Sequence, residues 1–133
     1  MTREGSPRAV ALRSRTILLA DDDLDMRDVV QDLLEESGYD VIPARTGRQA
    51  LDFLSMDPEA PPALVILDLM MPIVTGWQVL EAIQRDSKLF KVPVVIISAT
   101  CQDRPTGATA FLRKPFQIEE LLETVERLRA PIS

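Results

Sequence analysis

Apolar and polar residues alternate along the chain in blocks that predict strands and helices in turn. Thr16–Ala20, Leu64–Leu67 and Val94–Ile97 are short continuous apolar runs, which are typical of strands buried on both faces of a parallel sheet. Two weaker runs, Tyr39–Ile42 and Thr109–Leu112, predict two further strands. The chain is therefore expected to contain five strands.

Between these runs, apolar residues follow the three- and four-residue spacing of amphipathic helices. Gly38 is expected to stop the first of four such helices, and the proline-rich stretch 57–62 breaks the second. Gly76 is expected to give the third helix room to begin. The apolar positions of the four patterns are Met26, Val29, Val30, Leu33 and Leu34; Gly47, Ala50, Leu51 and Leu54; Val79, Leu80 and Ile83; and Ile118, Leu121, Leu122, Val125 and Leu128.

This alternation of strands and helices predicts an α/β fold, with a parallel sheet covered by helices on both faces. In such sheets the crossovers are right-handed, and ligands bind beyond the carboxyl ends of the strands. The length of 133 residues fits one domain, which we place at residues 16–130. Residues 1–15 form a polar leader with Gly5 and Pro7 and no periodic pattern, and we expect this leader to be flexible.

The composition excludes several kinds of chemistry. The chain has no histidine, so Ser–His triads and metal sites that contain histidine are ruled out. Cys101 is the single cysteine and cannot form an internal disulfide; we expect it to be an inert thiol. The apolar runs are far shorter than a membrane span, and no early segment resembles a signal peptide. We therefore expect a cytoplasmic protein with no membrane contact.

The charge is unevenly distributed. The net charge is −6, and the leader holds Arg3, Arg8, Arg13 and Arg15 against Glu4, so the remaining residues carry −9. An acidic body argues against nucleic-acid binding, because phosphate contacts need clustered Lys and Arg. The basic leader could contact an acidic partner, although a solvated leader is the simpler expectation.

Polar residues follow the predicted strands at the points where ligands bind in parallel sheets. Asp21 and Asp22 follow the first strand, Asp68 the third, Ser98 the fourth and Lys114 the fifth. Clustered carboxylates repel one another unless a cation lies among them, and oxygen ligands without His or Cys suit Mg²⁺. A lysine and a hydroxyl opposite the metal would complete a clamp for a phosphoryl group. Asp68 would then be the nucleophile that forms an aspartyl phosphate.

Four motifs carry a resemblance to a known family: ILLADDDLDMR, VILDLMMPIVTGWQVL, VVIISAT and FLRKPF. In this order and spacing the chain resembles, over Thr16–Arg129, the receiver domain of bacterial two-component response regulators, in particular single-domain regulators of the chemotaxis type. The resemblance implies a flavodoxin-like, doubly wound sheet of five parallel strands in the order 2-1-3-4-5. It also implies the Lys–Pro dipeptide at Lys114–Pro115, which is often cis.

The resemblance also implies a role for each residue of the candidate site. Asp68 matches the phosphoacceptor, Asp22 a direct metal ligand, Asp21 a ligand that acts through water, Met70 the residue whose backbone carbonyl completes the metal shell, Lys114 the phosphate-binding lysine, Ser98 the switch hydroxyl, and Phe111 the aromatic switch residue.

These observations predict a phosphoacceptor rather than an enzyme. The chain would take a phosphoryl group from a phosphohistidine of a histidine kinase or phosphotransfer protein, with Mg²⁺, and would promote its own phosphotransfer and dephosphorylation. The output would be contact with a downstream protein, by a monomer or weak dimer. We expect a stand-alone regulator, and the alternative that the chain is a receiver cut from a larger protein stays open. The second hypothesis is a degenerate receiver that acts as a phosphorylation-independent docking module.

An aspartate-based phosphohydrolase and a calcium-binding loop are both excluded by the residues present. The phosphohydrolase would need a substrate-covering cap and a longer core than this chain provides. An EF-hand loop that starts at Asp21 would need glycine where Met26 stands, and a bidentate glutamate where Asp32 stands.

The chain departs from the family between the fourth and fifth strands. Only 15 residues separate Ser98 from Lys114, and this segment is shorter than the corresponding segment of most receivers. Pro105 and Gly107 oppose a helix, and the apolar spacing of a helix is missing there. We therefore expect this helix, the fourth of the family fold, to be absent or reduced to one turn. The usual receiver dimer through this face is then not expected, and a partner would have to contact another surface.

Overall fold

The computed structural model describes residues 15–57, 59–100 and 103–129. Its strands form one parallel five-stranded sheet in the order β2-β1-β3-β4-β5, as the resemblance predicted. The leader up to residue 14 and Cys101 lie outside the described residues. The strands are β1 (Thr16–Ala20), β2 (Asp40–Ala44), β3 (Leu64–Asp68), β4 (Val94–Ser98) and β5 (Ala110–Arg113).

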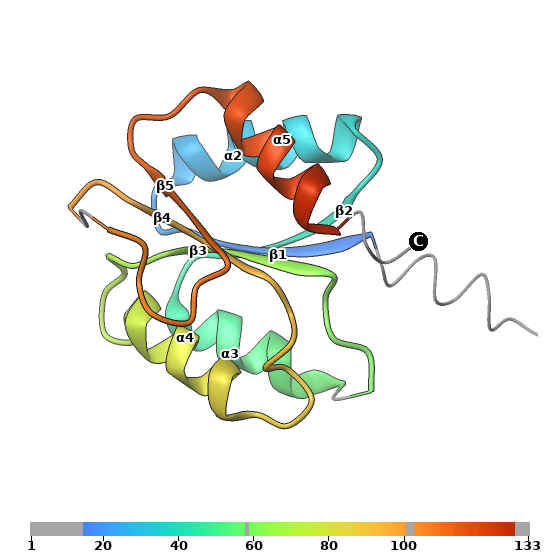
Figure 1. The fold of residues 1–133 in the computed structure, drawn as a ribbon, viewed down its shortest axis with the longest axis vertical. Coiled ribbons are helices and arrows are strands. Elements are labelled where there is room, and N and C mark those ends of the chain that lie inside the picture. The colour runs from blue at the N-terminus through green and yellow to red at the C-terminus, as the bar shows by residue number, and fades with distance from the viewer. Residues whose placement is uncertain (1–14, 58, 101–102, 130–133) are drawn as a thin grey trace, which may run out of the picture.

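Helices cover both faces of the sheet (Figure 1), which confirms the expected architecture. On one face lie α2 (Leu24–Glu36) and α5 (Ile118–Arg129), and on the other lie α3 (Gly47–Met56) and α4 (Gly76–Arg85). Each of the first three helices begins at a side-chain cap, from Asp23, Thr46 and Thr75 respectively, which satisfies backbone N–H groups that a helix leaves without partners. No helix in the described chain is both long and apolar enough to cross a bilayer.

The sheet separates two hydrophobic cores because side chains of a strand point alternately to its two faces. On β1, Leu18 and Ala20 pack with the α3–α4 layer, and Ile17 and Leu19 pack with the α2–α5 layer. The same alternation continues along β3 and β4, whose residues are all buried. Full burial on both faces explains why these three strands are continuous apolar runs in the sequence.

The predicted bounds of β2 are too early by one or two residues, because the structure places this strand at Asp40–Ala44 rather than 39–42. Pro43 lies within it, although proline cannot donate a hydrogen bond to a sheet. β2 is an edge strand with β1 as its neighbour, and an edge strand tolerates proline where its N–H would face solvent.

Between β4 and β5 the described residues, 99–100 and 103–109, contain no helix, and the fourth helix in chain order is α5. A turn lies there instead, with the Ala108 N–H donating to Pro105 O at 3.0 Å. Gln84 of α4 donates to Thr106 O at 3.3 Å, and Gly107 adopts a φ of 92° directly against the Gln84 side chain. In the described residues, a compact turn that packs on α4 thus leads into β5.

Candidate phosphoryl-transfer site

Four strands bring the predicted site residues to one edge of the sheet. Asp21 and Asp22 follow β1, Asp68 ends β3, Ser98 ends β4, and Lys114 follows β5. The parallel register aligns these ends, with Asp68 opposite Ile97 and Ser98 opposite Arg113. The predicted residues are therefore neighbours in space because parallel strands end at a common edge.

The three aspartates converge closely enough to share one cation. One carboxylate oxygen from each of Asp21, Asp22 and Asp68 lies within 4.8 Å of the others. Asp21 is completely buried and Asp68 is 4% exposed, whereas Asp22 is exposed. Hard carboxylate oxygens at this spacing are suitable ligands for Mg²⁺.

Lys114 closes the opposite side of the acidic cluster. Its Nζ lies 3.2 Å from Asp21 Oδ2 and 3.3 Å from Asp68 Oδ2. The Lys114–Pro115 peptide bond is cis, as the resemblance suggested. Burial disfavours the charge of Lys114, but Asp21 and Asp68 outweigh it and raise the pKa of the ammonium group. The lysine is therefore positively charged across the physiological range.

Asp68 is held in a fixed orientation by partners on both carboxylate oxygens. Its Oδ1 accepts the Met70 N–H at 3.0 Å, and its Oδ2 faces Lys114. Burial raises the pKa of Asp68 to about 6; the Met70 N–H and Lys114 lower it, and Asp21 raises it further. In the metal-free protein, the surroundings of Asp68 therefore disfavour the charged form of its carboxyl group.

This raised pKa predicts a pH-dependent difference in stability between the wild type and Asp68→Asn in EDTA. The pKa is about 6 in the folded chain against 3.8 without perturbation, so the folded state binds the proton more tightly. Asp68 therefore contributes its full stabilisation of the folded state below pH 3.8, and this contribution is lost as the pH rises through about 6. The variant should gain up to about 3 kcal/mol over wild type at pH 7 and almost nothing at pH 4.

Chemical denaturation at several pH values measures this difference. Saturating Mg²⁺ should reduce it, because the cation favours the carboxylate form of Asp68 in the wild type. An unchanged difference between pH 4 and pH 7 would show that Asp68 titrates normally.

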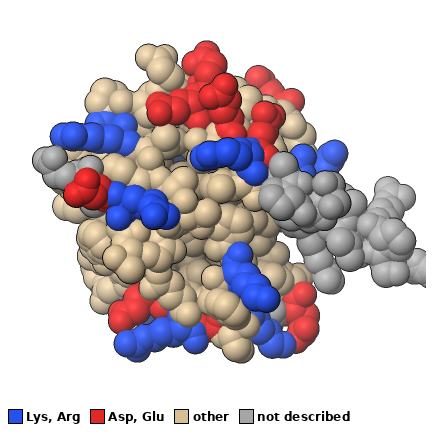
Figure 2. Space-filling model, viewed as in Figure 1, with Lys and Arg blue, Asp and Glu red and all other residues tan. Residues whose placement is uncertain are grey.

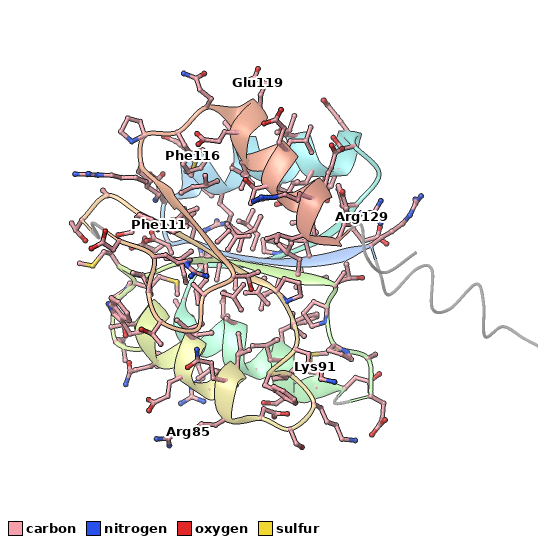
Figure 3. The ribbon with its side chains drawn as sticks, in the orientation of Figure 1. Arg85, Lys91, Phe111, Phe116, Glu119 and Arg129 are labelled. Carbon is pink, nitrogen blue, oxygen red and sulfur yellow. The ribbon has the colours of Figure 1, made fainter. Side chains whose placement is uncertain are left out.

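The remaining predicted residues lie around this cluster. Ser98 is fully buried, and its Oγ accepts the Thr100 N–H at 3.2 Å. Phe111 of β5 is half-buried and packs against the α3–α4 core (Figure 3). The Met70 side chain is 57% exposed, which is compatible with a role for its backbone alone.

Arg27 supports the site, although it was not among the residues predicted from the sequence. It is buried on the inner face of α2, and its guanidinium donates to Asp21 O at 2.8 Å. This bond holds the segment between β1 and α2 from which Asp21 and Asp22 project. A charged residue within the apolar stripe of Met26, Val30 and Leu34 was the available signal, since such a position is rarely charged without a partner.

The loop between β3 and α4 is held tightly beside Asp68. The Gly76 N–H donates to Leu69 O at 3.0 Å. A Cβ at Gly76 would lie 2.2 Å from Asp68 O, and a Cβ at Gly47 would lie 2.1 Å from Val74 O. The backbone can approach this closely at both positions only because glycine has no side chain.

Ile73 within this loop has a φ of 67° and is 96% exposed. A left-handed conformation costs about 1–2 kcal/mol for most residues, and the exposed side chain gains no burial in return. Asparagine tolerates this conformation better, so Ile73→Asn should raise the free energy of unfolding by about 1 kcal/mol. Chemical denaturation measures the change. Ile73→Val keeps the branched Cβ and should leave the free energy of unfolding unaltered. Equal free energies of unfolding for the two variants would show that the backbone at Ile73 is not strained.

Comparisons with known proteins agree with this geometry. Residues 17–126 match the family model of the response regulator receiver domain. Response regulator Rre1 of Synechocystis is 39% identical over 122 residues, which cover 86% of this chain and 52% of the relative. The polar-differentiation response regulator DivK of Brucella ovis is 30% identical over 116 residues, covering 83% of this chain and 91% of DivK.

A solved structure gives the same fold. The response regulator protein TrrA of Thermotoga maritima, in complex with Mg²⁺ and BeF, is 30% identical with a TM-score of 0.73, covering 86% of this chain and 98% of TrrA. The fold and site define a signalling module with an acidic pocket at the carboxyl edge of a parallel sheet. The chain belongs to the response regulator receiver domain family.

Response regulators interact with histidine kinases or phosphotransfer proteins and with downstream targets. Receiver domains are signalling modules and generally not classical enzymes. The chain spans about half the length of the first curated relatives it matches, at 52%, 48% and 48%.

Proposed function

We propose that this chain accepts a phosphoryl group on Asp68 from a phosphohistidine of a kinase or phosphotransfer protein. The observation that carries the proposal is the placement of one nearly buried carboxylate between Lys114 and the acidic pair Asp21 and Asp22. Asp68 is the aspartate that combines a fixed orientation with a cation on one side and potential metal ligands on the other.

The reaction moves the phosphoryl group from nitrogen to oxygen. A carboxylate oxygen of Asp68 forms a bond to phosphorus while the phosphorus–nitrogen bond of the donor breaks, and its electron pair stays on the imidazole nitrogen. Lys114 Nζ, already 3.3 Å from Asp68 Oδ2, lies where it can neutralise a phosphoryl oxygen. The Ser98 hydroxyl would donate to another phosphoryl oxygen from the end of β4.

The residues present fit a Mg²⁺ ion. Asp22, Asp68 and the Met70 carbonyl would hold it directly, and Asp21 would act through water. Three carboxylate oxygens lie within 4.8 Å of one another, and this set of oxygen donors agrees with the preference of the ion for oxygen. When bound, the ion would supply positive charge opposite Lys114, where the negative charge of the phosphoryl group must be balanced.

The product would change a protein-binding surface. An added phosphate carries about −1.5 to −2 charges at neutral pH, which would draw Ser98 towards it and favour an inward position of Phe111. The partner would be a downstream protein in the cytoplasm, contacted by a monomer or weak dimer. The turn at Pro105–Ala108 replaces part of the surface through which receivers commonly dimerise, so contact through another face is expected.

Incubation with acetyl phosphate tests this function. With Mg²⁺ the chain should gain one phosphate that is labile in both acid and base. Peptide mass spectrometry should locate this phosphate on Asp68. With EDTA the labelling should fall to background. Absence of any label under both conditions would favour the phosphorylation-independent docking module.

Metal binding is tested separately by two matched variants. Asp22→Ala should weaken Mg²⁺ binding by at least about tenfold, because it removes a direct charged ligand. Asp25→Ala removes the same charge from the exposed first turn of α2 and should have little effect. Wild type should melt at a higher temperature in millimolar Mg²⁺, since binding to the folded state stabilises it. Equal Mg²⁺-induced shifts in all three proteins would contradict the ligand assignment.

A further inference from the structure

The side chain of Arg27 is buried, although its helix offers many exposed carboxylates. Figure 2 shows acidic side chains gathered over the α2–α5 layer at the top of the view. Arg27 is the only basic residue of α2, yet it is 5% exposed and forms no ion pair within the described part of the chain. Pairing with a surface carboxylate therefore does not explain its position. The exposed carboxylates of α2 are those of Asp25, Asp28, Asp32, Glu35 and Glu36.

Packing of α2 does not require a charge at this position either. The Asp23 side chain caps the helix by accepting the Met26 N–H at 3.2 Å. Val30 and Leu34, both fully buried, pack the same face of α2 against the sheet. A guanidinium group loses its hydration on burial, and an apolar side chain would fill this space without that cost. The contact that the guanidinium makes is therefore the better explanation of its presence.

This contact is made to the peptide bond that joins the two aspartates of the acidic pair. The Arg27 guanidinium donates to Asp21 O at 2.8 Å, a length typical of charge-assisted hydrogen bonds. Because the peptide bond is planar, a fixed carbonyl oxygen also fixes the Cα atom of Asp22, from which the side chain projects. The bond from Arg27 thus restrains the orientation of Asp22.

The two aspartates of the pair are held very differently. The Asp21 N–H donates to Ala44 O at 3.0 Å. Its Oδ1 accepts the Asp23 N–H at 2.9 Å, and its Oδ2 lies 3.2 Å from Lys114 Nζ. The Asp22 side chain, in contrast, is exposed and forms no hydrogen bond or ion pair within residues 15–57, 59–100 and 103–129. The direction of the Asp22 carboxylate therefore depends on the backbone next to it.

We propose that Arg27 is a positioning residue for the metal, whose bond to Asp21 O directs the Asp22 carboxylate towards the ion. This inference rests on the proposed function, in which Asp22 is a direct Mg²⁺ ligand. One carboxylate oxygen of Asp22 lies within 4.8 Å of an oxygen from each of Asp21 and Asp68. Rotation of the peptide plane before Asp22 would move its carboxylate away from this shared position, and binding of the ion would have to restore it.

The bond and the charge of Arg27 affect metal affinity in opposite directions. A positive charge near a cation site repels the cation, so loss of the charge alone would tighten Mg²⁺ binding. Loss of the bond to Asp21 O would weaken Mg²⁺ binding, because residues that orient metal ligands typically contribute about 10–100-fold to affinity. The direction in which the Kd changes therefore separates positioning from simple electrostatics.

Calorimetric titration of the full chain with Mg²⁺ tests this role without a phosphodonor. Arg27→Met fills the space without a donor and should raise the Kd about tenfold. Arg27→Gln has a shorter, uncharged side chain and should also raise the Kd, so the test stands even where the apolar variant does not fold. Arg27→Lys keeps a charged donor and should recover most of the affinity. The control, Val30→Ala, removes buried volume from the same face of α2 and should bind Mg²⁺ like wild type.

Two results of the titration would overturn the proposal. One is a Kd for the Met and Gln variants of Arg27 that equals or falls below that of wild type. The other is equal weakening in Val30→Ala, which would assign the effect to the packing of α2. Wild type that binds Mg²⁺ but takes no label from acetyl phosphate would refute the phosphoacceptor role and leave the positioning role of Arg27 intact.

Labelling by acetyl phosphate gives a second measurement of the same effect. In Arg27→Met the Mg²⁺ concentration for half-maximal labelling should rise about tenfold, while the rate at saturating Mg²⁺ should stay near that of wild type. A lower rate at saturating Mg²⁺ with an unchanged half-maximal concentration would contradict a role through the metal.

Discussion

Replacing Asp68 with asparagine is expected to abolish phosphorylation completely. The amide keeps the size and shape of the carboxylate but removes the nucleophilic oxygen charge and one metal ligand. No other carboxylate in the described residues combines the end of the central strand with the contact to Lys114 Nζ at 3.3 Å and the hydrogen bond from the Met70 N–H at 3.0 Å. Asp21 also contacts Lys114 but is fully buried, so a donor cannot approach it.

Acetyl phosphate with Mg²⁺, followed by intact-protein mass spectrometry, measures this loss. Asp52→Asn is the matched control, because Asp52 is an exposed residue of α3 whose carboxylate is 67% exposed. The control should be labelled like wild type. Full labelling of Asp68→Asn would assign the phosphate to another residue and overturn the proposed role of Asp68.

Much of the fold could be predicted because each buried strand leaves a direct trace in the sequence. β1, β3 and β4 are covered on both faces, so their residues are apolar without interruption, and the aspartates or serine that follow mark their ends. The site was predictable for the same reason, since parallel strands must bring these ends together. The edge strand β2 left a weaker trace: its predicted range of 39–42 stops before Pro43, a residue that an edge strand can accept.

The features that the sequence did not predict depend on backbone positions within short loops beside the site. The backbone carbonyl of Asp21 is the acceptor for Arg27, and a pattern of side chains carries no information about which carbonyl lies nearby. The left-handed backbone of Ile73 is likewise imposed by the tight loop around it, against the preference of a branched residue. Gly76 was expected only to give α4 room to begin, whereas the structure places it directly against the backbone of Asp68.

Gly76→Ala is accordingly expected to destabilise the chain severely. Its Cβ would lie 2.2 Å from Asp68 O and 2.6 Å from Leu69 Cα, and these are backbone atoms of β3 and its loop that cannot rotate away. We expect a loss of about 3 kcal/mol or more in the free energy of unfolding, at the upper end of what overpacking costs. Chemical denaturation measures this loss.

The same substitution should also impair the chemistry, because the atoms that must move belong to Asp68 itself. Gly47→Ala provides the comparison: its Cβ would lie 2.1 Å from Val74 O, so it should destabilise the chain to a similar degree while displacing the far end of the loop. Under conditions where both variants are folded, labelling by acetyl phosphate should fall further in Gly76→Ala than in Gly47→Ala. Equal labelling in the two variants would show that the contact of Gly76 with Asp68 serves stability alone.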